Sequence, residues 1–396
     1  MTRLKSFSKA GHFPTLISSL LYFDVSFMIW VLFGATSNFI ATDLQLSDAQ
    51  KGMMVAIPIL GGAFLRLPLG ILADRYGGKR VGLIGMAVTM IPLAATALFA
   101  DQIHEIYAYG ILLGIAGASF AVALPLAGRW YPPEHQGLAM GLVGAGNSGT
   151  ALAMLFAPRL SEMFGWNAVF GLALIPLVIV FILFSIFVKD SPNQPKQVKF
   201  ADFISIMKRL DSWYLCLVYS LCFGSFVGLS SYLSIFFFDY YHVSKVQSGD
   251  FVTFLAFTAS FIRPVGGYLA DRFGGTYILQ YIFLSISFLL FMIGFLPPIL
   301  LAIVLFFLLM LSLGLANGAL FQVIPNMYRE NVGVITGLVG AAGGFGGFFL
   351  PNILATMKQL TGTYSYGYWW IAATALTITA LLIKLKDRWT HISSNS

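Results

Sequence analysis

Two arginines in the middle of hydrophobic segments are the first residues of this sequence that could do chemistry. Arg66 lies in "GGAFLRLPLGILADRYGG" (residues 61–78), and Arg263 lies 197 positions later in "FIRPVGGYLADRFGG". A guanidinium keeps its proton in a protein, and each such charge costs about 2.5–3.5 kcal/mol at the centre of a membrane-spanning helix. Its planar fork of N–H donors suits bidentate recognition of an oxyanion. The alternative is that each arginine pairs permanently with a helix carbonyl or an acid.

Asp24, in "LYFDVSFMIW", is the one acidic residue deep in a predicted span, and none of the five histidines lies in such a position. Two arginines (+2) and one ionised aspartate (−1) leave a charge that a single monovalent anion would neutralise. The sum favours a small monoanion over a divalent phosphate ester. A carboxyl group in a low dielectric can also carry a proton, so Asp24 is a candidate for proton coupling. The competing interpretation makes Asp24 a fixed counter-ion for an arginine.

The composition indicates a membrane protein. The 396 residues are 58% hydrophobic and 10% charged, with a mean hydropathy of +0.83, whereas soluble domains carry roughly 25% charged residues. A helix needs about 20 apolar residues to cross a bilayer. Windows of that length predict an all-α polytopic membrane protein with twelve transmembrane helices, at 15–39, 52–72, 81–100, 106–128, 137–158, 167–188, 213–238, 250–270, 277–296, 298–320, 333–356 and 364–385.

The loop charges set the predicted orientation. With the N-terminus inside, 17 of the 23 Lys and Arg residues fall in cytoplasmic segments, and outer loops hold only four: Lys51, Arg159, Lys245 and Lys358. The positive-inside rule therefore predicts a multi-pass protein of the cell membrane with both termini cytoplasmic. Because the basic residues lie in short loops next to membrane lipid, the net charge of +7 does not indicate nucleic-acid binding.

An internal repeat divides the chain. Residues 189–212 form the longest polar connection and separate a predicted six-helix bundle (1–188) from a second one (213–396). Within this cytoplasmic linker, "FADFISIMKRL" predicts a short helix on the membrane face. Six residues of the first half recur at an offset of 197: Arg66, Gly70, Asp74, Arg75, Gly77 and Gly78 match Arg263, Gly267, Asp271, Arg272, Gly274 and Gly275. Duplicated six-helix halves are typical of secondary transporters, which bind substrate between the halves near mid-membrane.

Other classes of protein fit these observations less well. A membrane enzyme would need a metal-ligand cluster, an intramembrane histidine or an activated nucleophile. Cys216 and Cys222 fit no zinc ligand set, so we predict no enzyme activity, no metal and no cofactor. A sensor would require a soluble output domain, which we do not find, and duplicated halves disfavour a channel. We expect a monomer.

The loop between the second and third predicted spans resembles that of the major facilitator superfamily. The stretch "GILADRYGGKR" (Gly70 to Arg80) looks like the loop motif of that superfamily, and "GYLADRFGG" is its copy in the second half. Asp74 and Asp271 could face a helix terminus or pair with basic neighbours, and so gate the cytoplasmic side together with Arg75 and Arg272. The alternative is that these are only positive-inside loop charges.

Two glycine-rich stretches narrow the resemblance to the nitrate/nitrite porter family. "GLVGAGNSGT" and "GLVGAAGGFGGFFLP" resemble the paired signatures of that family, and small residues at this spacing allow close helix packing. "FDVSFMIW" and "FVGLSSYLSIFF" look closest to the Bacillus-type assimilatory nitrate transporter. The resemblance runs over essentially the whole chain.

The resemblance implies a set of substrate-binding residues. Arg66 and Arg263 match the arginines that clamp the anion from opposite halves, and Tyr219 matches a tyrosine whose hydroxyl reaches it. Phe120 and Phe321 match aromatic residues that close above and below the planar ion. Asn147 matches the polar member of the first glycine stretch and either donates to the anion or bridges two helices. The second stretch has Gly343 at that place, so a symmetric role there is in doubt.

The implied function is secondary active import of nitrate, and of nitrite, by alternating access. An inside-negative potential opposes anion entry by about 2.3 kcal/mol per 100 mV, so accumulation needs proton symport or exchange for an internal anion such as nitrite. Asp24 favours symport. The alternatives are a nitrate/nitrite exchanger, or a carrier of another small anion such as formate or an organophosphate.

Overall fold

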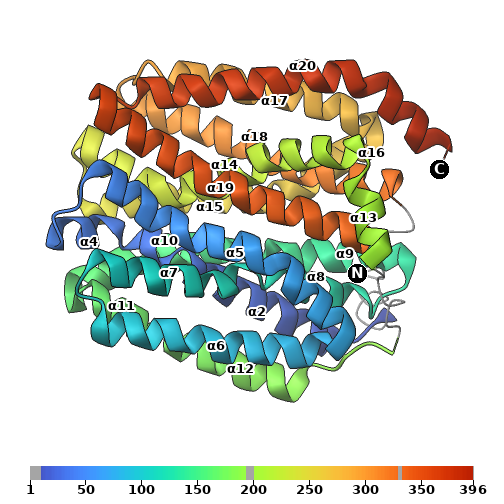
Figure 1. Cartoon of the computed structure of the whole chain (residues 1–396), viewed down its shortest axis with the longest axis horizontal. Helices are drawn as coiled ribbons and strands as arrows, with labels where there is room; N and C mark the ends of the chain where they lie inside the picture. Colours follow the sequence, from blue (N-terminus) through green and yellow to red (C-terminus); the bar gives the residue numbers. More distant parts are fainter. Residues whose placement is uncertain (1–9, 193–199, 329–331, 396) are drawn as a thin grey trace.

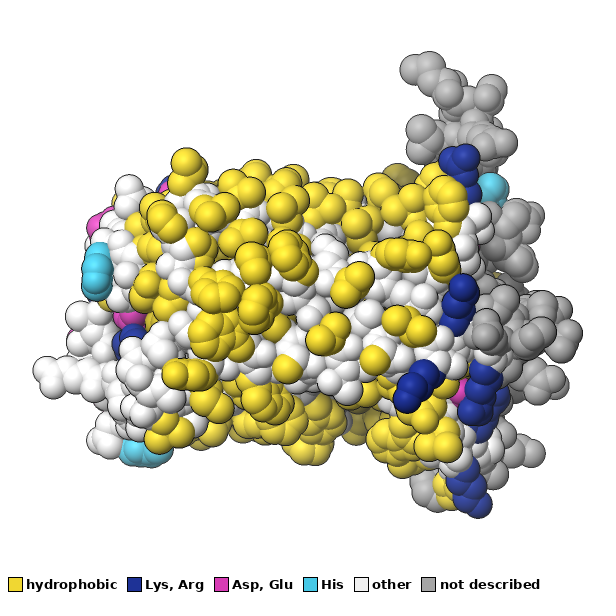
Figure 2. Space-filling view, turned by 90° about the horizontal axis from the view of Figure 1, so that it is seen from above, with side chains coloured by type: hydrophobic (Ala, Val, Ile, Leu, Met, Phe, Trp, Pro, Cys, Tyr) yellow, Lys and Arg dark blue, Asp and Glu magenta, His cyan; other side chains and the backbone are white. Residues whose placement is uncertain are grey.

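A computed structural model describes residues 10–192, 200–328 and 332–395 of the chain. Twelve helices in these ranges are long and apolar enough to cross a membrane, which confirms the predicted all-α fold. They run along the long axis of the molecule (Figure 1). On the face that Figure 2 shows, apolar side chains cover the middle of the molecule, and Lys and Arg gather mainly at the end where Figure 1 places the linker helix α13. The chain is therefore a multi-pass membrane protein.

The first six spans are composed of eleven α-helices and one 3₁₀ turn. Their bounds are α2 (Phe13–Trp30), α3 (Leu32–Ala35), α4 (Ser37–Asp43), α5 (Asp48–Tyr76), α6 (Gly78–Phe99), α7 (Ile103–Gly117), α8 (Phe120–Gly128), α9 (Pro133–Gly144), η1 (Ala145–Ser148), α10 (Gly149–Phe164), α11 (Trp166–Leu172) and α12 (Leu174–Phe187). The linker contains α13 (Phe200–Met207), so the short helix predicted there is confirmed.

The last six spans are composed of seven helices. They are α14 (Leu210–Tyr241), α15 (Lys245–Phe261), α16 (Arg263–Phe273), α17 (Gly275–Ile293), α18 (Ile299–Met327), α19 (Val332–Thr361) and α20 (Ser365–Asn395). Helix α2 begins, and α20 ends, at the end of the molecule where α13 lies (Figure 1). Six basic residues used to predict the orientation lie outside the described residues: Arg3, Lys5, Lys9, Lys196, Lys199 and Arg329.

Several spans that the sequence predicts as continuous are interrupted. Span eight breaks at Ile262, because Pro264 has no N–H to continue the helix from α15 into α16. Span five contains the 3₁₀ turn η1 between α9 and α10, where glycines weaken the α-helix. Span four breaks between α7 and α8, directly before Phe120. Arg263, Asn147 and Phe120 therefore all lie at helix interruptions.

Helices α5 and α19 run side by side through the centre of the molecule (Figure 1). A Cβ added to Gly344 of α19 would lie 2.7 Å from the Cβ of Ala63, and one added to Gly347 would lie 3.0 Å from Ile59. The glycines thus let the two backbones approach more closely than larger side chains would allow. This contact joins the first six spans to the last six.

Four charged side chains of alternating sign join α5, α14 and α19 at the end of the bundle away from α13. We call Asp48 and Lys51 of α5, Asp239 of α14 and Lys358 of α19 the charge quartet. The Lys51 Nζ lies 2.8 Å from Asp239 and 3.4 Å from Asp48, and the Lys358 Nζ lies 3.3 Å from Asp239 and 3.5 Å from Asp48. Two of these four pairs cross between the halves of the chain. If the halves separated, each would keep one neutral pair.

The quartet predicts that Asp239→Asn will loosen this end of the bundle. A hydrogen bond to a charged group contributes about 1.5–3 kcal/mol, so we expect about a tenfold rise in the population with the halves apart. Spin labels at Thr42→Cys and Leu360→Cys, in a Cys216→Ala/Cys222→Ala background, would measure the distance across this end.

Asp250→Asn is the matched control, because the Arg159–Asp250 pair also joins the halves but its side chains are 41% and 39% exposed. Solvent screening makes such a pair worth less. An unchanged distance distribution in Asp239→Asn, or an equal change in both variants, would contradict the prediction.

Candidate functional site

Arg66 is buried in the centre of the molecule, with a relative exposure of 1%. Its Nε donates to the carbonyl of Gly117 at 3.3 Å, and its Nη1 donates to the carbonyl of Gly340 on α19. Its Nη2 has no hydrogen-bond partner. Permanent pairing with helix carbonyls, the alternative role for this arginine, therefore accounts for two of its three guanidinium nitrogens. The third, Nη2, remains available to bind a ligand.

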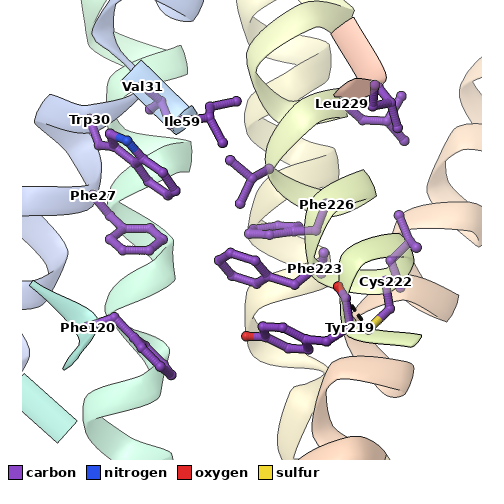
Figure 3. Close-up of a cluster of buried hydrophobic side chains, with 14 of the residues drawn as sticks. Phe27, Trp30, Val31, Ile59, Phe120, Tyr219, Cys222, Phe223, Phe226 and Leu229 are labelled. Atoms are coloured by element: carbon purple, nitrogen blue, oxygen red, sulfur yellow. Dashed lines mark hydrogen bonds between the residues drawn. The ribbon is translucent and has the colours of Figure 1, made fainter. Parts of the chain in front are cut away.

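Aromatic rings surround this guanidinium. Its Cζ lies 4.8 Å from the ring centroid of Phe223, 5.4 Å from that of Trp30 and 5.6 Å from that of Phe120. Aromatic faces attract a cation, and in a desolvated site each contact contributes about 2 kcal/mol. Figure 3 shows side chains of α2 and α14 facing one another here, with Phe120 beside them.

Arg263 and Tyr219 reach the same region from the last six spans. Arg66, Arg263 and Tyr219 interact electrostatically with one another. The Tyr219 hydroxyl is buried close to the Arg263 guanidinium without forming a regular hydrogen bond, and the Nη1 of Arg263 is buried with no partner. The two halves therefore bring two guanidinium groups and one hydroxyl together at the interface.

Phe120 and Phe321 complete the cluster. Their ring centroids are 6.1 Å apart, and Phe321 packs edge-on against Tyr219 at 5.4 Å. Five of the six predicted binding residues are thus brought together: Arg66, Arg263, Tyr219, Phe120 and Phe321. We call these five the arginine site.

Asn147 lies beside α2 and not within this set of contacts. It is fully buried in η1, and neither its amide nitrogen nor its amide oxygen has a hydrogen-bond partner. The neighbouring Gly146 packs against Phe23, whose ring lies 5.7 Å from Phe120. The residue next to Asn147 is therefore connected to the arginine site through Phe23, and the role of Asn147 itself remains a prediction.

Asp24 faces span five and not the arginines. Its carboxylate accepts a hydrogen bond from the Ser148 hydroxyl at 2.7 Å and one from the backbone N–H of Gly149. Among the ion pairs of the described residues, none joins Asp24 to Arg66 or Arg263. The structure therefore gives no support to Asp24 as a fixed counter-ion.

The two copies of the loop motif differ. Asp74 forms an ion pair with Arg129, just beyond the end of α8, and Gly70 lies near α8, with Ala121 3.7 Å from an added Cβ. Arg75 instead packs over the ring of Tyr76. In the second copy, Asp271 and Arg272 are exposed, and Arg272 packs over Phe273. Within the described ranges Asp271 has no ion pair, so pairing of the motif aspartate with a basic residue is seen in the first copy only, and the gating role of the motif remains a prediction.

Sequence reasoning missed Trp30 and Phe223, which contact the Arg66 guanidinium. Phe223 follows Tyr219 by four residues, so both lie on one face of α14, and their rings stack at 5.0 Å. That spacing could have indicated Phe223. No local signal marks Trp30, because its contact with Arg66 joins two different helices.

The fold is that of a known class of membrane protein. The chain matches the Major Facilitator Superfamily over residues 18–351. Its structure is similar to that of a D-xylose-proton symporter, with a TM-score of 0.76 and 15% identity over 93% of this chain and 97% of that chain. It is also similar to an inward-facing, occupied bacterial homolog of the human lysosomal transporter Spinster (TM-score 0.68, 17% identity, 96% of each chain). The class is a major facilitator transporter.

Relatives by sequence narrow the assignment. The nitrite extrusion protein of Bacillus subtilis is 31% identical over 93% of this chain and 94% of its own length. The probable nitrate/nitrite transporter NarK2 of Mycobacterium tuberculosis is 32% identical over 90% and 93%. The probable nitrate/nitrite antiporter NarK1 of Thermus thermophilus is 32% identical over 87% and 85%. The chain belongs to the nitrate/nitrite porter family of the major facilitator superfamily, as its arginines and glycine stretches predicted.

Substitution of Gly343 would test how tightly α19 packs against the Tyr219 ring. A Cβ added at Gly343 would lie 2.5 Å from the Tyr219 ring, whereas one added at Gly141 would meet nothing within 4 Å. We expect Gly343→Ala to destabilise the protein by about 1–3 kcal/mol through overpacking. Gly141→Ala should be neutral, or stabilising by up to about 1 kcal/mol, because alanine favours the helix. Thermal unfolding in detergent would measure both, and equal melting temperatures would contradict the packing.

Proposed function

We propose that the protein imports nitrate, and accepts nitrite, across the cell membrane. The observation that carries the proposal is the pair of buried guanidinium nitrogens without partners, Arg66 Nη2 and Arg263 Nη1, beside the Tyr219 hydroxyl. A buried N–H without an acceptor is costly, and an oxyanion supplies acceptors to all three groups at once. The names of the sequence relatives support nitrate or nitrite as that anion.

The aromatic rings favour a small planar ion. The ring centroids of Phe120 and Phe321 lie 6.1 Å apart and their planes are tilted by 51°, whereas an ion packed flat between two parallel rings needs about 7 Å, two carbon contacts of 3.5 Å. The rings would therefore have to turn toward parallel and move apart by a small amount on binding. A bulky organophosphate would require a much larger opening, so this spacing supports nitrate or nitrite over that alternative.

Transport is proposed to follow alternating access between two bundles, residues 1–188 and 213–396. Arg66 and Arg263 come from different bundles, and their like charges oppose closure of the empty site. An anion offsets that repulsion, so the loaded carrier can rock between its two states. The charge quartet would close one end of the bundle in the state described here.

Proton symport is the proposed source of energy. Entry of one anion against an inside-negative potential costs about 2.3 kcal/mol per 100 mV, and a cotransported proton cancels that charge. Asp24 supports this coupling because its carboxylate bonds to Ser148 and not to an arginine. Nitrate/nitrite exchange is the second candidate, favoured by the name of the Thermus relative.

The cellular setting is part of the proposal. The predicted loop charges, and the basic end of the molecule seen in Figure 2, support both termini in the cytoplasm. We propose a monomer that serves nitrate assimilation, on the resemblance to the Bacillus-type transporter. The nitrite extrusion protein among the relatives supports the opposite direction, which the uptake experiments below would distinguish.

Arg66→Lys and Arg263→Lys test the arginine site. Lysine keeps the charge but replaces the planar fork by one point donor, so we expect the KM for nitrate to rise about a hundredfold, within the range of 2–5 kcal/mol for a buried charged hydrogen bond. Labelled nitrate uptake into proteoliposomes with an imposed inward proton gradient measures this. Arg209→Lys, at an exposed position of the linker, is the matched control. No uptake by the unaltered protein, with a gradient or with nitrite inside, would reject nitrate as substrate.

Asp24→Asn separates symport from exchange. Asparagine keeps the hydrogen bond from Ser148 but cannot carry a proton, so gradient-driven nitrate uptake should fall to background while exchange against internal nitrite continues. The exposed Asp101→Asn is the control. Full gradient-driven uptake by Asp24→Asn would rule out the proton-carrier role, and uptake that always requires internal nitrite would make the protein an exchanger.

A further inference from the structure

Trp30 occupies a space that two glycines leave beside Arg66. Its side chain is 1% exposed, at the end of α2 where span one bends into α3. A Cβ added to Gly62 of α5 would lie 2.9 Å from the indole, and one added to Gly117 of α7 would collide with it. The indole is therefore wedged between α5 and α7, and neither helix could carry alanine there without displacing it.

Two contacts fix the orientation of the indole. Its Nε1 donates to the carbonyl of Pro58 on α5 at 2.7 Å, and its ring packs edge-on against Phe27 at 4.9 Å. A buried N–H must find an acceptor, so this hydrogen bond determines which way the ring points. In this orientation the ring lies beside the Arg66 guanidinium, whose Cζ is 5.4 Å from the ring centroid.

Gly117 links the tryptophan to the arginine. The absence of a side chain at Gly117 admits the indole, while its carbonyl accepts from the Arg66 Nε at 3.3 Å. A guanidinium is planar. Because the Gly117 carbonyl holds its Nε and the indole packs near it, the N–H groups of Nη2 can point in only a narrow range of directions. The free Nη2 is the donor assigned above to the anion, and this inference rests on that proposed function.

We propose that Trp30 is a positioning residue for anion binding, which holds the Arg66 guanidinium at a fixed depth and aims its Nη2 at the substrate. Trp30 itself does not need to touch the anion. Its loss leaves space into which the flexible arginine side chain can retreat, so binding weakens while the rest of the transport cycle is retained.

Trp30→Phe is the test. Phenylalanine keeps an aromatic ring. It loses the hydrogen bond to the Pro58 carbonyl and fills less of the space between α5 and α7. We expect the KM for nitrate to rise roughly tenfold with the maximal rate within about twofold of the unaltered protein. A purely structural role would lower the amount of folded protein, and hence the maximal rate per membrane, and leave KM unchanged.

Trp369→Phe is a matched control elsewhere in the chain. Trp369 also donates from Nε1 to a helix carbonyl, that of Phe291 at 3.2 Å, and also fills the space beside a glycine, Gly294. It therefore loses the same contacts without an arginine nearby, and its KM should not change. If Trp30→Phe does not fold, Gly62→Ala displaces the indole instead and should raise KM in the same direction.

The outcomes separate this inference from the proposed function. Uptake by the unaltered protein and by Trp369→Phe, with an unchanged KM in Trp30→Phe and in Gly62→Ala, would overturn the positioning role and leave nitrate transport intact. Absence of nitrate uptake by the unaltered protein would instead reject the proposed function. A raised KM in Trp30→Phe or Gly62→Ala, but not in Trp369→Phe, would support the positioning role.

Discussion

Burial of the Arg66 guanidinium is the constraint on which the rest of this structure depends. A permanent charge at the centre of an apolar bundle is costly, and partners for its donors and its faces lower that cost. Carbonyls from α7 and α19 accept two of its N–H groups, and three aromatic rings lie against it. The residue that is most expensive to bury therefore has partners on several helices, and its remaining nitrogen, Nη2, is buried without one.

The position of this charge makes the site a junction between the halves. Arg66 belongs to the first six spans, whereas the Gly340 carbonyl and the Phe223 ring belong to the last six. Glycines on α19 bring its backbone close enough to α5 for that carbonyl to be reached. Any movement of one half against the other must change the contacts of this arginine. In the transport cycle proposed above, that is how an occupied site would act on the position of the bundles.

The two ends of the bundle use charge differently. The charge quartet joins the halves at one end, because two of its four ion pairs cross between them. At the other end, Asp74 pairs with Arg129 inside the first half, and Asp271 of the repeat is exposed. A sequence repeat thus does not impose a structural repeat, since the pairing of a loop aspartate depends on what the neighbouring helix presents.

Hydropathy and charge were enough to predict the twelve spans, the repeat and the arginine pair, because both act locally and a charge stands out in an apolar segment. The resemblance to a family then supplied Tyr219, Phe120 and Phe321. Which groups meet could be learned from the packed helices alone. Trp30 contacts Arg66 across two helices, Asp24 pairs with Ser148 and not with an arginine, and Lys51 joins a quartet. Such contacts depend on how distant helices pack, and no local pattern of residues records that.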